Sequence, residues 1–114
     1  MSVTELLTLL KSDPSAIQFK QVIELIEESY DYMPTRFVNG SVVNEAGTNE
    51  GSCKIFAFAE LNGLSEPETL ALFGHYYRDD VLGNPDGSDH GNIRNFMISG
   101  WSGVKFDSKA LLEK

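Results

Sequence analysis

The stretch that decides the fold is Asn44–Ala59, with the sequence NEAGTNEGSCKIFAFA. Its first half is rich in glycine, asparagine and glutamate, and its second half is almost continuously apolar. A helix that is apolar on nearly every side belongs at the centre of a domain. We therefore predict a central helix from Cys53 to Leu61, which Asn62-Gly63 ends and a polar loop precedes.

The start of this helix is a candidate binding surface. N–H groups of a first helical turn have no partner inside the helix, so they can bind a polar or negatively charged group. With a start near Cys53, these groups belong to Ser52, Cys53, Lys54 and Ile55.

Outward from this helix, serines followed three residues later by Glu or Gln predict three capped helix starts. The pairs are Ser2/Glu5, Ser15/Gln18 and Ser65/Glu68, and they predict helices over about 3–12, 15–30 and 65–77. The second helix has an apolar stripe made by Phe19, Val22, Ile23, Ile26 and Tyr30. A polar loop over 79–91 then leads to a last helix near 92–99, where Gly100 would bring Trp101 against Phe96.

Two short segments predict β-structure. Residues 36–43 surround Asn39-Gly40, a dipeptide that favours the two-residue turn of a β-hairpin. Val104 and Phe106 alternate with polar neighbours and predict a short C-terminal strand. The predicted fold class is α+β and helix-dominated, a single small domain of about five helices with a minor β-hairpin at 36–43.

Charge and composition exclude several partners. Seventeen acidic and nine basic residues give a net charge of −8, which repels nucleic acids and anionic membranes. The chain has no apolar run as long as a membrane span and no leader with a basic start. Its single cysteine cannot form an internal disulfide, which fits a reducing compartment. We expect a monomeric bacterial protein of the cytoplasm.

Cys53 and His90 are weak catalytic candidates. A thiol at a helix start beside Lys54 would lose its proton readily, and His90 could act as its base. The alternative is that Cys53 packs as a small buried hydrophobic residue, which we favour.

Known ligand motifs fail at particular positions. In Gly47–Lys54, Cys53 and Ile55 flank the lysine where a phosphate-binding loop needs Gly and Ser or Thr. A calcium loop from Asn84 has Asp89 at the glycine position and Asn95 at the glutamate position. We expect neither a metal nor a cofactor.

Several motifs within Tyr30–Phe106 recur together in one family. They are NEAGTNEGSCKIFAFA, Gly63-Leu64, Phe73 with Tyr76-Tyr77-Arg78, the segment 87–96 (GSDHGNIRNF), and Gly100-Trp101. In these motifs the chain resembles the HopJ family, which is named after a type III effector of plant-pathogenic bacteria. The resemblance implies one HopJ-like domain over 1–114 and brings no catalytic residues to carry over. It also implies a second localisation, secretion by a type III system in some organisms.

The resemblance directs the site hypothesis to two polar segments, Asn44–Lys54 and Asp89–Arg94, as facing walls of one cleft. The binding candidates are Asn44, Glu45, Asn49, Glu50, Lys54, Asp89, His90, Asn92 and Arg94. We expect a small acidic intracellular binding or interaction protein, whose partner is a protein or a small polar ligand. The alternative is a cysteine-dependent hydrolase or transferase that uses Cys53 and His90; we favour a protein without enzymatic activity.

Overall fold

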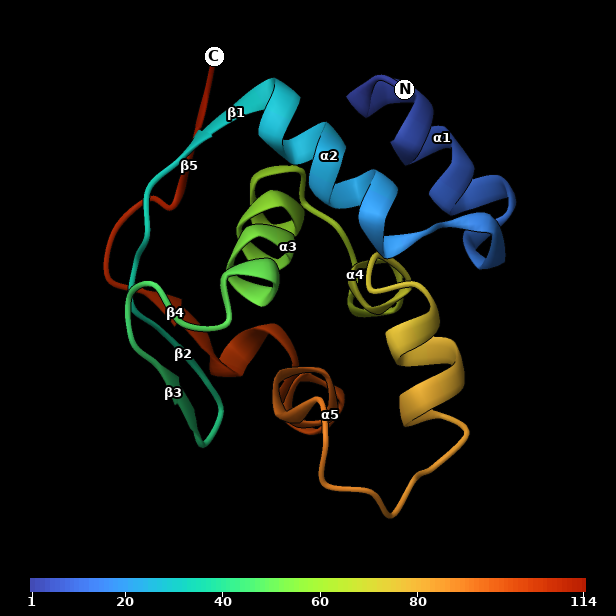
Figure 1. Cartoon of the computed structure of the whole chain (residues 1–114), viewed down its shortest axis with the longest axis vertical. Helices are drawn as coiled ribbons and strands as arrows, with labels where there is room; N and C mark the ends of the chain where they lie inside the picture. Colours follow the sequence, from blue (N-terminus) through green and yellow to red (C-terminus); the bar gives the residue numbers. More distant parts are fainter.

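The computed structural model describes all 114 residues as one α+β domain, in which the helices pack together and a small amount of antiparallel sheet lies along one side (Figure 1). The helices are α1 (Val3–Ser12), α2 (Phe19–Ser29), α3 (Glu50–Leu61), α4 (Glu66–Ala71) and α5 (Gly91–Ser99), with the π-helix η2 (Tyr76–Val81) and the 3-10 turns η1 (Pro14–Ala16) and η3 (Gly100–Gly103). The strands are β1 (Tyr30–Tyr32), β2 (Phe37–Asn39), β3 (Val42–Asn44), β4 (Val104–Phe106) and β5 (Leu111–Glu113). None of the helices combines the length and the apolar character that a membrane crossing needs.

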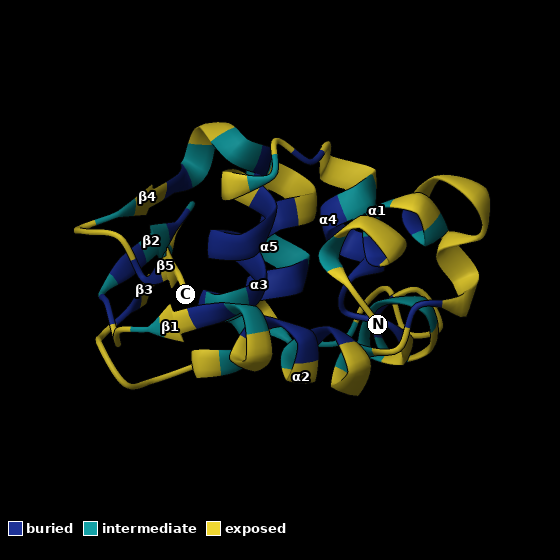
Figure 2. Ribbon diagram, turned by 90° about the horizontal axis from the view of Figure 1, so that it is seen from above, coloured by how far each residue is buried: buried dark blue, intermediate teal, exposed yellow.

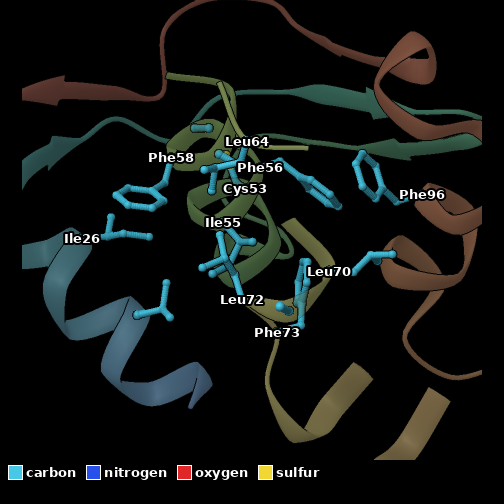
Figure 3. Packing of buried hydrophobic residues seen from close by; sticks show 14 of the residues in the cluster. Ile26, Cys53, Ile55, Phe56, Phe58, Leu64, Leu70, Leu72, Phe73 and Phe96 are labelled. Carbon is cyan, nitrogen blue, oxygen red and sulfur yellow. The ribbon is translucent and has the colours of Figure 1, made fainter. Parts of the chain in front are cut away.

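Helix α3 is the central helix, as predicted. Figure 1 shows it enclosed by α2, α4, α5 and the three-stranded sheet, and Figure 2 shows it buried along most of its length. Its residue Phe56 lies in the middle of an aromatic cluster, with ring centroids 5.0 Å from Phe96, 5.5 Å from Phe73 and 6.1 Å from Phe37. Phe58 and Ile55 extend the same core toward Ile26 of α2 (Figure 3).

The hairpin is confirmed, but its turn is one residue later than predicted. Asn39 pairs with Val42, so the turn residues are Gly40 and Ser41. Asn39 cannot be a turn residue because its side chain is fully buried and bonded to Asn92 of α5. The predicted strand at 104–106 is confirmed as β4, which pairs with β2 and gives the strand order β3-β2-β4.

A second pairing, between β1 and β5, is absent from the sequence-based prediction. Tyr30 was expected to extend the stripe of α2, but α2 ends at Ser29 and Tyr30 pairs with Glu113. The core face of α2 is formed by Val22, Leu25 and Ile26.

Two of the three predicted capping boxes form. The hydroxyls of Ser2 and Ser65 accept the N–H groups of Glu5 and Glu68. The box at Ser15 was wrong, because the Ser15 hydroxyl donates to Asp13 within a 3-10 turn, and α2 begins later, at Phe19.

The helix predicted over 65–77 is two elements. Helix α4 ends at Ala71, and η2 follows Gly74, which has a φ of +60°. A side chain at Gly74 would begin 2.8 Å from the backbone nitrogen of Phe19, so the close approach of two chain segments requires glycine here. The predicted polar loop over 79–91 is therefore shorter, because Asp79 lies within η2.

Removing the ring of Phe56 should test the central position of α3. Phe56→Ala leaves a cavity among three other aromatic rings and should lower the free energy of unfolding by about 3 to 5 kcal/mol. The measurement is chemical denaturation, with Leu61→Ala as a control because Leu61 is half exposed on the same helix. A loss below about 1 kcal/mol for Phe56→Ala would contradict the assignment.

Candidate functional site

A cavity of about 570 Å³ lies where helices α3 and α5 begin. Its polar wall comes from both predicted segments, and its apolar wall from α2, the turn after α4, and η2. The lining residues are Phe19, Asn49, Gly51, Ser52, Phe73, Tyr76, His90, Gly91, Asn92 and Ile93. The two segments that sequence placed in one cleft therefore do contribute to one cavity.

Both helices begin in the same unusual way. The residues before them, Asn49 and His90, have φ angles of 49° and 51° and are the only residues other than glycine with positive φ. Neither side chain accepts a hydrogen bond from its helix. The N–H groups of Gly51, Ser52, Gly91 and Asn92 consequently have no acceptor in the protein.

The start of α3 corrects the prediction made for its N–H groups. Because the helix begins at Glu50, the N–H of Cys53 already donates to the carbonyl of Asn49 at 3.0 Å. Of the four predicted donors, Ser52 stays unpartnered, and the other open N–H groups of this helix start precede it.

Four asparagines, three of them buried, hold the two helix starts together. The side chains of Asn44 and Asn92 exchange two hydrogen bonds, of 3.1 and 2.9 Å. Asn49 donates to the Asn44 oxygen at 2.7 Å, and Asn39 donates to the Asn92 carbonyl at 2.8 Å. This asparagine cluster of Asn39, Asn44, Asn49 and Asn92 joins the hairpin to both helices.

His90 is positioned by residues of η2. Its Nε2 lies 3.0 Å from the Asp80 carboxylate, and since a carboxylate only accepts, this nitrogen carries the hydrogen. The ring of His90 also lies 5.2 Å from that of Tyr76. The imidazole is thus fixed at the mouth of the cavity.

The other charged candidates lie outside the lining. Glu45 pairs with Arg36, and Glu50 is exposed. Lys54 pairs with Glu27 and lies over the Tyr32 ring. Arg94 pairs with Asp89 at 2.7 Å and holds the pKa of that carboxyl below its usual range. We find no group of three His, Cys, Asp or Glu side chains arranged to hold a metal ion.

The comparisons with known proteins agree with this architecture. The family model described as HopJ type III effector protein matches residues 3–111. The chain belongs to the HopJ family. It is also similar to a crystal structure of an unknown function protein, VPA0580, with 48% identity, a TM-score of 0.98, and coverage of 100% of this chain and 95% of that one. None of the curated proteins matches the chain.

In this HopJ-family protein, Cys53 and His90 have separate surroundings. The Cys53 thiol is buried, and its one hydrogen-bond partner is the carbonyl of Thr35, at 3.8 Å. Burial raises the pKa of Cys53, and burial with the nearby Cys53 and Glu50 raises that of Tyr32. Cys53 does not line the cavity, and no hydrogen bond joins it to His90.

Sequence reasoning missed several residues of the site. The cavity wall includes Phe19, Phe73 and Tyr76, and Asp80 holds His90. The glycines at 51 and 91 were a usable signal, because a glycine in the first turn leaves the helix N–H groups open to a ligand. Phe19 and Asp80 carry no such signal, since tertiary packing alone brings them to the site.

The Cys53 thiol should react slowly with a thiol reagent in native protein, because it is buried and its pKa is raised. The measurement is the labelling rate at neutral pH, with the denatured chain as the fully reactive control. Labelling of native protein as fast as that of the denatured chain would contradict the burial of Cys53 and return it to the catalytic candidates.

Asn44→Ala should lower the free energy of unfolding by about 1 to 3 kcal/mol, because it leaves the side-chain NH2 groups of Asn92 and Asn49 without their acceptor, the Asn44 oxygen. Asn84→Ala is the matched control, since Asn84 is exposed and its side chain makes no hydrogen bond in the protein. Equal stability of the two variants would show that the cluster does not hold the helix starts.

Proposed function

We propose that this HopJ-family domain is a small acidic binding protein that takes a small monoanion, such as an aromatic carboxylate, into the cavity between α3 and α5. The observation that carries the proposal is the pair of helix starts that face one cavity with N–H groups lacking acceptors. Carboxylates and phosphates are the groups that bind such helix ends.

The balance of charge favours a single negative charge on the ligand. Each helix start contributes roughly half a positive elementary charge, so two together match about one negative charge. The chain carries −8, and Asp80 and Asp89 lie beside His90, so a multiply charged phosphate would be repelled.

The apolar wall indicates the rest of the ligand. Phe19 and Tyr76 pack edge to face with ring centroids 5.0 Å apart, and Phe73 stacks beside Phe19. A flat apolar body would pack against these rings while its carboxylate meets the N–H groups. Binding of this kind needs no covalent chemistry. We place the protein in the bacterial cytoplasm, or in a recipient cell when it is exported.

Binding should be tested with benzoate and phenylacetate, and with benzamide as a neutral control of the same shape. Protein amide NMR shifts should change at residues 49–52 and 90–93 with the carboxylates, and benzamide should bind at least about tenfold more weakly. Inorganic phosphate tests the preference for a monoanion.

Gly91→Leu should block the cavity without unfolding the protein. A Cβ at Gly91 meets no atom within 4 Å, and leucine favours a helix more than glycine does. Binding should fall at least about tenfold in this variant and persist in Gln21→Leu, whose side chain is exposed on α2. Carboxylate binding that survives Gly91→Leu, or that benzamide reproduces, would refute the proposed site.

A further inference from the structure

A second hollow lies farther along α5, beyond the first turn that lines the cavity, and forms a separate surface. This apolar groove of about 370 Å³ runs between the end of η2 and α5. Its walls are Val81, Leu82, Pro85, Gly87, Arg94, Met97 and Ile98, none of which lines the cavity described above.

The groove exposes large apolar side chains together. Ile98 is 83% exposed, the most of any large hydrophobic residue in the chain, and Leu82 and Met97 are about half exposed. Single exposed hydrophobic residues are ordinary, but several that line one hollow mark a surface for a partner.

Contacts with the rest of the protein hold the walls of the groove in place. On one side, Arg78 of η2 donates to the carbonyl of Ile17 at 2.9 Å, and Val81 is buried. Leu82 donates its N–H to the carbonyl of Tyr77, the five-residue spacing of a π-turn, and such turns are frequent at functional sites. On the other side, Arg94, Met97 and Ile98 have the i, i+3, i+4 spacing of one helix face.

One carboxylate without an ion-pair partner borders the groove. It belongs to Asp86, which lies between the groove residues Pro85 and Gly87. The one basic residue of the groove, Arg94, is already paired with Asp89. A partner therefore meets an apolar floor and a negative edge.

We propose that this groove binds an amphipathic helix of another protein, with leucine- or methionine-type side chains on one face and lysine or arginine beside them. Helices that bind grooves in this way insert anchors spaced at i, i+3 or i+4. A second copy of the chain is disfavoured as the occupant, because two copies of a protein of charge −8 repel one another.

The test uses two synthetic helices of about 18 residues, long enough to be partly helical alone. Both carry leucines at i, i+3, i+4 and i+7; one has lysines on the remaining face, and the other has glutamates. The lysine peptide should bind, with NMR shifts at residues 81–87 and 94–98, and its affinity should fall with added salt. The glutamate peptide should bind at least about tenfold more weakly.

Matched variants separate groove binding from general charge attraction. Ile98→Ser and Met97→Ser should each weaken binding of the lysine peptide about tenfold, because each removes an exposed apolar side chain that contacts the peptide and that folding does not need. Met33→Ser, at a methionine of similar exposure outside the groove, should leave binding unchanged. Asp86→Asn should weaken binding and reduce its salt dependence, whereas Glu113→Gln should not.

Three results would overturn the proposal. One is an affinity for the glutamate peptide equal to that for the lysine peptide. Another is an affinity of Ile98→Ser for the lysine peptide equal to that of the native protein. The third is a dimer of the native protein in sedimentation that Ile98→Ser converts to a monomer, since the groove would then be covered by a second copy. Because Ile98 does not line the cavity, Ile98→Ser should not change carboxylate affinity, which distinguishes failure here from failure of the carboxylate site.

Discussion

The reciprocal hydrogen bonds between Asn44 and Asn92 are the constraint on which the site depends. They connect the end of β3 to the first turn of α5, across 48 residues of sequence, and both side chains are buried. An amide pair of this kind satisfies one donor and one acceptor on each residue, and separating the two side chains would leave those buried groups unpaired. The pair thereby fixes the distance between two helices whose starts form the polar wall of the cavity.

The asparagine cluster works only because α3 is fixed by its apolar side. Phe56 lies among Phe37, Phe73 and Phe96, which come from β2, the turn after α4, and α5. The aromatic core therefore joins α3 to β2 and α5, two elements that the amides also connect at the polar end of α3. Directional polar contacts specify the register at one end, and non-directional packing supplies most of the stability along the rest.

An element of this fold could be predicted from the sequence when the contact that determines it joins residues close together in the chain. The cap at Ser65 is decided by Glu68 three residues away and could be predicted, whereas Asn39 left the hairpin turn because its partner lies 53 residues later. The strands β1 and β5 have three residues each and pair across the whole chain, so neither has a pattern of its own. Gly74 breaks the predicted helix because the backbone of Phe19 passes beside it.

For the candidate site, sequence reasoning pointed to two segments that do line the cavity, but not to the atoms that form its polar wall. Asn49 and His90 belong to the residue types that tolerate positive φ, yet their left-handed conformation comes from the folded surroundings. The charged side chains Lys54 and Arg94 looked like anion ligands in sequence, but each is occupied by a carboxylate, Glu27 or Asp89. Backbone N–H groups, which sequence letters do not show, take their place in the cavity wall.

Helix α5 connects the two surfaces physically. Its first turn, residues 91–93, lines the cavity, and residues 94, 97 and 98 line the groove, so one nine-residue helix contributes to both. Ile93 and Phe96 of this helix are buried in the close-packed core, so packing fixes the two sets of lining residues relative to each other.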